Sequence, residues 1–293
     1  MKKITSFVVG VFLLFNFVFA NANDITKINI LYTQNTNGVL ENCHCPVLPL
    51  GGLEKRQTIL KEFRKSHSNV LFFDSGDFFS FRKDSAKNVK VIKAMQLMKY
   101  DAVNIGVQEF STGETFLINQ LQNNNINVIS TNLKFKKADF SVSKVIYKTI
   151  GNIKIAILGI VDPNDITYYE KGNKFQLKRY NPTDIIKKWH EIANQDKFDI
   201  VILLSNMGFE KDKEIADKFN FIDIIIGGHT QNEFHNPKYI NNTIITQSGK
   251  DGKYIGSLQI EIKDKKIDSY SGKLIPVKLG TKDDEEILSI IKD

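Results

Sequence analysis

The chain has 293 residues, of which 42% are hydrophobic and 25% are charged, and its formal net charge is +7. This length lies within the range of a single α/β domain and is sufficient to bury a large core. The basic residues are scattered, and their densest cluster, at 134–137, is typical of a solvated loop, so we expect no nucleic-acid partner.

The first 22 residues have the pattern of a secretion signal. Lys2 and Lys3 precede an apolar stretch at 4–19, and Ala-Asn-Ala at 20–22 supplies the small residues that a signal peptidase accepts. The alternative is a membrane anchor, but Asn16 interrupts the stretch and a span needs about 20 apolar residues. We expect a signal peptide at 1–22, one mature domain at 23–293, a secreted protein in a periplasmic or extracellular location, and no membrane association after cleavage.

Short apolar runs alternate with amphipathic stretches in the first half of the mature chain. Apolar runs bounded by turn residues predict buried strands, and apolar residues at helical spacing predict the helices between them. The expected strands are 28–32, 70–73, 102–105 and 128–130, and the expected helices are 52–65, 86–99 and 112–123.

The second half begins with a predicted hairpin and ends in β structure. Strands at 144–150 and 153–161 flank Gly151-Asn152, a dipeptide suited to a tight primed turn. Because strands that are apolar on both faces must be covered on both, we expect two sheets with helices outside them. The further elements are a helix from Pro182, a strand at 200–204, a helix at 211–219, a strand at 222–226, and tail strands at 243–246 and 254–262 next to turns at 241–242 and 264–265.

Polar residues follow four of the predicted strands. In an open α/β sheet the ligand crevice lies beyond the carboxyl ends of the strands, so these segments are expected to converge on one site. They are Thr-Gln-Asn-Thr-Asn-Gly at 33–38, Asp-Ser-Gly-Asp at 74–77, Ser-Asn-Met-Gly at 205–208 and Gly-Gly-His-Thr-Gln at 227–231.

In this order the segments resemble the motifs of the metallophosphoesterase (calcineurin-like phosphoesterase) domain of the secreted 5′-nucleotidase family. The family motifs read Asp-x-His, Gly-Asp, Gly-Asn-His-Glu, Ser-His and Gly-His-Thr-His, and the similarity covers nearly the whole mature chain. Residues 51–56 and 249–256 resemble two further family segments. The resemblance implies a four-layer α/β-β/α sandwich, and a hydrolase mechanism in which two divalent cations activate water and neutralise the phosphoryl oxygens. Family nucleotidases also carry a C-terminal nucleoside-binding domain, which we expect this chain to lack.

Neutral side chains occupy most of the functional positions that the resemblance implies. Six residues stand where the family has Asp, Asn or His: Asn35, Asn37, Val107, Gln108, Asn206 and Gln231. Among them, Gln108 occupies the position of the family's catalytic His. Only Asp77 and His229 match metal-ligand positions, and Glu109 is kept beside them. An amide oxygen can bind a hard cation but brings no charge, so two ligands will not hold two metals.

These replacements predict a pseudoenzyme with an altered pocket. Without two dications, carboxylates facing each other in a low-dielectric cleft would repel, and Asn35 removes that cost. We expect the amides to hydrogen-bond to one another around a polar pocket that holds no metal. This pocket would bind a small polar or phosphorylated ligand, or a protein partner. The alternative is that the amides only satisfy one another's hydrogen bonds and bind nothing. The predicted ligand-binding residues are Asn35, Asn37, Asp77, Asn206, His229 and Gln231. The enzyme alternative is a weak phosphoesterase with one divalent metal held by Asp77, His229 and amide oxygens.

The only two cysteines lie in Cys43-His44-Cys45-Pro46, directly after the first polar segment. Some relatives of this fold carry a similar Cys-x-Cys-Pro segment, so the resemblance extends to a subgroup. The leading interpretation is a disulfide between Cys43 and Cys45, because paired cysteines outside the cytosol usually oxidise. In extended backbone the two Cα atoms would be about 7 Å apart, at the limit for a disulfide, so the chain must bend. The alternative is a thiolate metal site or redox site that includes His44 or His229.

Overall fold

The computed structural model describes residues 25–42, 45–47, 49–171, 174–196 and 198–293. The predicted signal peptide at 1–22, together with Cys43 and His44, lies outside these ranges. Within them, no helix combines the length and the apolar character that crossing a bilayer requires.

The first sheet joins strands from both ends of the chain. Its six strands are β1 (Thr26–Thr33), β2 (Val70–Asp74), β3 (Ala102–Asn104), β4 (Val128–Ile129), β13 (Tyr254–Lys263) and β14 (Lys266–Pro276). They are ordered β14-β13-β1-β2-β3-β4. The pairs from β1 to β4 are parallel, whereas β13 is antiparallel to both β1 and β14. The carboxyl ends of β1, β2 and β3 therefore point to one edge of the sheet.

The second sheet comes from the middle of the chain. Its six strands are β6 (Ile146–Ile150), β7 (Ile153–Val161), β9 (Ile200–Asn206), β10 (Ile224–Gly227), β11 (Lys238–Ile240) and β12 (Thr243–Thr246). Their order is β11-β12-β10-β9-β7-β6, with parallel pairing from β7 to β12 and antiparallel strands at both edges. A separate two-stranded sheet pairs β5 (Leu133–Phe135) with β8 (Leu177–Arg179).

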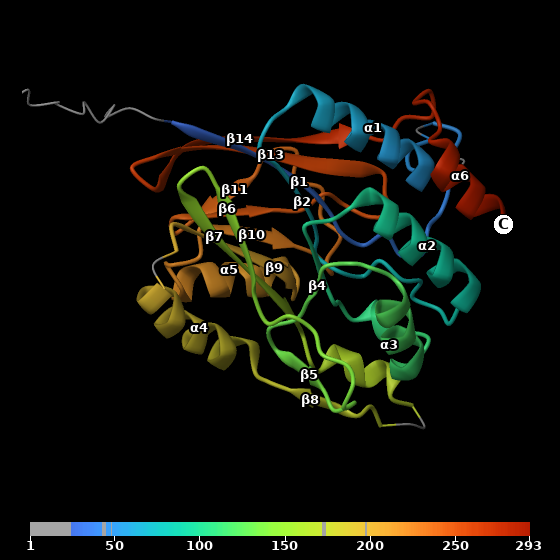
Figure 1. Cartoon of the computed structure of the whole chain (residues 1–293), viewed down its shortest axis with the longest axis horizontal. Helices are drawn as coiled ribbons and strands as arrows, with labels where there is room; N and C mark the ends of the chain where they lie inside the picture. The colour runs from blue at the N-terminus through green and yellow to red at the C-terminus, as the bar shows by residue number, and fades with distance from the viewer. Residues whose placement is uncertain (1–24, 43–44, 48, 172–173, 197) are drawn as a thin grey trace, which may run out of the picture.

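Helices cover the outer faces of the two sheets. They are α1 (Leu53–Ser66), α2 (Ser85–Met98), α3 (Glu114–Asn123), α4 (Pro182–Asp196), α5 (Phe209–Lys218) and α6 (Glu285–Lys292), with short 3-10 helices η1 (Gln108–Phe110) and η2 (Asp165–Tyr169). Figure 1 shows α1 outside the first sheet, and α4 and α5 outside the second. The layers therefore run helix, sheet, sheet, helix, as predicted.

The period of two along each strand explains why the two sheets stack. In β1, Ile30 joins the core between the sheets, while Leu31 faces the core under α1 and α2. In β9, Ile202 contributes to the inter-sheet core, while Leu203 packs in the outer core with α5. Both faces of the central strands are thus apolar and buried, which an isolated sheet could not satisfy.

Most predicted elements are present, with boundaries shifted by a few residues. The predicted turn at 241–242 connects β11 to β12, and the turn at 264–265 connects β13 to β14. All four turn residues have positive φ, between 44° and 69°, as a type I′ hairpin turn requires. The sequence prediction did not include α6, which has only eight residues, or β5 and β8, which are three residues each and pair across a long stretch of chain.

Candidate functional site at the carboxyl ends of the strands

Hydrogen bonds join the polar loops across the boundary between the two sheets. The Ser75 hydroxyl, in the loop after β2, donates to the carbonyl of Ile226 in β10 at 2.6 Å. The side-chain amide of Asn206, at the end of β9, donates to the Ser75 carbonyl at 3.2 Å. The backbone N–H of Asn35, after β1, donates to the Gly76 carbonyl at 2.9 Å. Segments from four strands therefore meet in one place.

Left-handed backbone conformations recur at this meeting point. Positive φ values between 47° and 67° occur at Asn35, Asn37, Asp77, His229 and Gln231. Asn, Asp and His occur in this region more often than other residues, whereas a side chain such as Gln costs about 1–2 kcal/mol there. Such conformations persist only where the surroundings hold them, and they cluster at functional sites.

Asp77 is a buried carboxylate whose two oxygens have different partners. Its Oδ1 accepts the backbone N–H groups of Val107 at 3.0 Å and Gln108 at 2.9 Å, at the start of η1. Its Oδ2 accepts the side-chain amide of Asn35 at 3.2 Å. One oxygen thus fixes the neighbouring loop, and the other faces the predicted ligand-binding residues.

Glu109 accepts hydrogen bonds from the backbone of the loop that carries Asp77. Its fully buried carboxylate accepts three backbone N–H groups, from Gly106 at 2.7 Å and from Asp77 and Phe79 at 3.0 Å each. Burial, and then the nearby Asp77 carboxylate, raise the pKa of Glu109 to about 8, against the opposing effect of the N–H donors. Glu109 therefore positions the Asp77 loop.

His229 lies between two carboxylates. Its Nδ1 is 3.8 Å from Oδ2 of Asp77, which is too far for a hydrogen bond but close enough for charge attraction, and its Nε2 is 3.5 Å from Oδ2 of Asp165 in η2. The Asp77 carboxylate is the main reason that the pKa of His229 is raised above its ordinary value. The imidazole is consequently biased toward its cationic form.

The expected mutual saturation of the amides is only partly realised. Gln108 donates from Nε2 to Oδ1 of Asn37 at 3.1 Å, and Asn37 donates from Nδ2 to Oδ1 of Asp251 at 2.8 Å. Asn206 instead accepts the Val107 N–H at 3.3 Å. Oδ1 of Asn35 and Oε1 of Gln108 are buried without a hydrogen-bond partner in the described part of the chain. Two buried acceptor oxygens at the site are thus left unsatisfied by the described residues.

A pocket of about 560 Å³ opens beside these residues. Its lining includes Asp77, Gln108, His229 and Gln231, together with an aromatic wall made of Phe81, Tyr168 and Tyr169. The predicted ligand-binding residues Asn35, Asn37 and Asn206 do not line it. The rings of Phe81 and Tyr168 are stacked at 5.7 Å between centroids, with an interplanar angle of 26°. The hydroxyl of Tyr169 donates to the Phe81 carbonyl at 3.1 Å.

The aromatic wall and Asp165 were not predicted from the sequence. Tyr168, Tyr169 and Asp165 belong to η2, which follows β7 in a segment without a recognisable motif. Phe81 lies in the connection between β2 and α2. The only signal available was their position after the carboxyl ends of β2 and β7, which is the edge where ligands bind in such sheets.

Of the predicted cysteine site, only Cys45 lies within the described residues, where it is disulfide-bonded. Cys43 and His44 lie outside them. Among the described residues, no group of three or more His, Cys, Asp or Glu side chains comes together in a way that could hold a metal ion.

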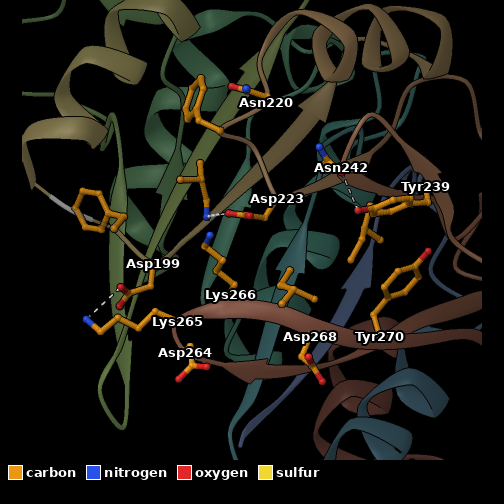
Figure 2. A pocket seen from close by; sticks show the side chains of 15 residues that line it. Asp199, Asn220, Asp223, Tyr239, Asn242, Asp264, Lys265, Lys266, Asp268 and Tyr270 are labelled. Atoms are coloured by element: carbon orange, nitrogen blue, oxygen red, sulfur yellow. Dashed lines mark hydrogen bonds and ion pairs between the residues drawn. The ribbon is translucent and has the colours of Figure 1, made fainter.

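A larger hollow of about 730 Å³ lies at the opposite end of the strands (Figure 2). Asp199 and Asp223 precede β9 and β10 there, Lys265 lies 3.3 Å from Asp199, and Tyr239 stacks on Tyr270. None of the predicted site residues lines this hollow. Its chemistry is therefore separate from that of the strand-end loops.

The four-layer sandwich with polar loops at the carboxyl ends of its strands is the metallophosphoesterase fold of the 5′-nucleotidase structures. The sequence pattern of the calcineurin-like phosphoesterases matches residues 24–233, and the chain belongs to this family.

Known proteins support the same assignment. A snake venom 5′-nucleotidase from Naja atra is 25% identical over 264 residues, which cover 81% of this chain and 50% of the relative. The 5′-nucleotidase of Mus musculus is 27% identical over 276 residues, which cover 82% of this chain and 47% of the relative. The crystal structure of a 5′-nucleotidase precursor from Thermus thermophilus superposes with a TM-score of 0.81 at 17% identity, over 91% of this chain and 58% of that structure. The chain thus spans about half the length of these curated relatives.

Proposed function

We propose that the mature protein is a pseudoenzyme that binds a small polar ligand at the strand-end pocket and does not hydrolyse phosphate esters. The observation that carries the proposal is the state of Asp77, whose oxygens accept three N–H groups of this chain, including the amide of Asn35. A carboxylate whose oxygens accept N–H donors has little capacity left to bridge two cations.

The other donors at the site support the same conclusion. A two-metal phosphoesterase needs several charged or imidazole ligands around two cations a few ångströms apart. Here Asn35, Asn37 and Asn206 supply only neutral amides, and each of their side chains hydrogen-bonds to a neighbouring residue. The residues present do not fit a pair of dications.

Two observations support action outside the cytosol. Cys45 is disulfide-bonded, which is typical of an oxidising compartment, and the first 22 residues have a signal-peptide pattern. Mass spectrometry of protein recovered from the periplasm or medium should find a mature chain that begins near Asn23. An intact N-terminus in the cytosolic fraction would contradict the proposed location.

The second candidate function is a weak phosphoesterase with a single divalent metal. The unpartnered oxygens of Asn35 and Gln108 favour it, because amide oxygens are acceptable ligands for hard cations and Asp77 and His229 lie beside them. A thiolate site at Cys43 and Cys45 is disfavoured while Cys45 is oxidised.

Metal analysis together with phosphoester turnover separates these functions. Purified mature protein would be incubated with MnCl2 or ZnCl2, desalted, analysed for bound metal, and assayed with AMP and bis(p-nitrophenyl) phosphate. The proposal predicts no turnover above the Asp77→Ala background. Two bound cations with turnover that disappears in Asp77→Ala would overturn it. One cation with turnover would establish the single-metal enzyme, and one zinc ion lost on Cys43→Ser would establish the thiolate site.

A further inference from the structure

Hydrogen bonds to carboxylates determine how the pocket amides are oriented. Asn35 must direct its NH2 group toward Oδ2 of Asp77, because its carbonyl oxygen would be repelled there. Asp251 orients Asn37 in the same way, and Oδ1 of Asn37 in turn orients the NH2 group of Gln108. Both remaining carbonyl oxygens are buried without a donor, and of the two residues Gln108 lines the pocket, whereas Asn35 does not. The pocket therefore needs a ligand that donates hydrogen bonds.

The charge of the pocket points to the same kind of ligand. Its lining contains the carboxylates of Asp77 and Asp165 and one basic side chain, His229. Two lysines lie nearby: Lys211 is paired with Asp162, and Lys171 lies against the Tyr168 ring. Without metal ions, these charges oppose the entry of a phosphate group and favour a cation.

The aromatic wall adds a surface that suits an organic cation. The side chains of Phe81 and Tyr168 are 53% and 51% exposed although both are large and hydrophobic. Nζ of Lys171 lies 4.5 Å from the Tyr168 ring centroid, so this lysine already takes the cation position on that ring and the aromatic wall is left to the apolar part of a ligand. A ring or an alkyl chain on the ligand would cover the remaining apolar surface.

We propose that the pocket binds a small organic ammonium compound, whose amine donates to Oε1 of Gln108 and whose apolar part packs on Phe81 and Tyr168. This inference rests on the proposed noncatalytic function. It specifies the ligand as a cation, whereas the substrates of a phosphoesterase are anionic phosphate esters. The pocket volume of about 560 Å³ lies within the range of small-molecule sites.

Calorimetric titration of the mature protein with a matched pair of probes tests the proposal. Tyramine and 4-hydroxyphenylacetate carry the same phenol ring, but the first is a cation and the second an anion. We expect tyramine to bind at least about tenfold more tightly than the acid, and inorganic phosphate not to compete. Asp165→Asn should weaken tyramine binding about fivefold, and Tyr168→Ala about three- to tenfold.

The hollow at the other end of the strands supplies control variants. Tyr239 is 57% exposed and stacked on another ring, like Tyr168, and Asp268 is an exposed carboxylate that lines the same hollow (Figure 2). Tyr239→Ala and Asp268→Asn should change tyramine affinity by less than about twofold. Because Asp165, Tyr168 and both control residues are at least partly exposed, all four variants should retain the wild-type circular dichroism spectrum and melting temperature.

The possible outcomes separate the two proposals. Tighter binding of phosphate or 4-hydroxyphenylacetate than of tyramine would overturn the proposal of an ammonium ligand. The proposal that the protein is a noncatalytic binding protein would then still stand. Binding of MnCl2 alone, or of no probe at millimolar concentration, would also overturn it. Phosphoester turnover would overturn the noncatalytic function itself.

Discussion

Asn35→Asp tests whether an amide at this position is an electrostatic requirement of a pocket without metal. The amide nitrogen of Asn35 lies 3.2 Å from Oδ2 of Asp77, and both side chains are buried. A carboxylate in its place would bring two negative oxygens to about that separation. With an effective dielectric constant of about 20, the repulsion is about 5 kcal/mol. Protonating one of the two acids at pH 7.5 would cost a similar amount, since an ordinary Asp has a pKa of about 3.9. We expect the variant to lose about 3–5 kcal/mol of unfolding free energy at pH 7.5.

The loss of unfolding free energy in Asn35→Asp should depend on pH. The folded-state pKa of the new carboxyl would be raised above its unfolded value, so the folded protein would bind more protons than the unfolded chain between the two values. The penalty should therefore be small below about pH 4 and grow as pH rises, by up to about 1.4 kcal/mol per pH unit. At pH 4.5 we expect a difference of about 1 kcal/mol from wild type.

Urea unfolding of wild type and variant at pH 4.5 and pH 7.5 measures this difference. Asn88→Asp is the matched control, because Asn88 is equally buried but contacts the Thr112 hydroxyl and the Ser80 N–H rather than a carboxylate. Its cost should be smaller. MnCl2 should restore part of the stability of Asn35→Asp and none of that of Asn88→Asp, because a bound dication stabilises only the folded state. A loss below about 1 kcal/mol at pH 7.5, or an equal loss at both pH values, would refute the electrostatic reasoning.

Two other predictions concern the same site. Asp77→Asn should lower the pKa of His229 toward its ordinary value of 6.5, because the Asp77 carboxylate is the main cause of the raised pKa. An NMR titration of the His229 ring proton measures this pKa. An unchanged titration midpoint would contradict the assigned cause. Gly106→Ala should lower the free energy of unfolding in urea by about 1–3 kcal/mol, because a Cβ there would lie 2.7 Å from the backbone N of Asp77. Gly280→Ala is the control and should be neutral, because a Cβ there would have no atom within 4 Å. Equal effects of the two substitutions would refute close packing at Gly106.

The layered fold could be predicted because its signals are local. Ile30, Leu31 and their neighbours form short apolar runs that end in polar segments, and the two-residue hairpin turns carry Asn, Asp and Gly. These patterns depend on period and turn chemistry alone. The convergence of the loops at the site followed from the general rule for open α/β sheets, together with the ordered motifs.

The partners of each site residue could not be predicted, because they depend on side-chain direction. Asp251, which holds Asn37, is more than 200 positions away in the chain, and nothing in the segment at 249–256 indicates that contact. The aromatic wall could not be predicted for the same reason: Phe81 lies in the connection after β2 and Tyr168 in η2 after β7, and their rings stack because these strands, from different sheets, end on the same side of the sandwich. The predicted amide network is only partly realised, because two carboxylates, rather than other amides, orient Asn35 and Asn37.

The left-handed backbone at Asn35, Asn37, Asp77, His229 and Gln231 has a consequence for protein engineering. Most residues are strained at such torsions, and β-branched residues most of all, so only a few replacements at these five positions would keep the loop backbone unchanged. A change of ligand chemistry in this scaffold therefore requires either a choice among those few residues or new loops to carry others.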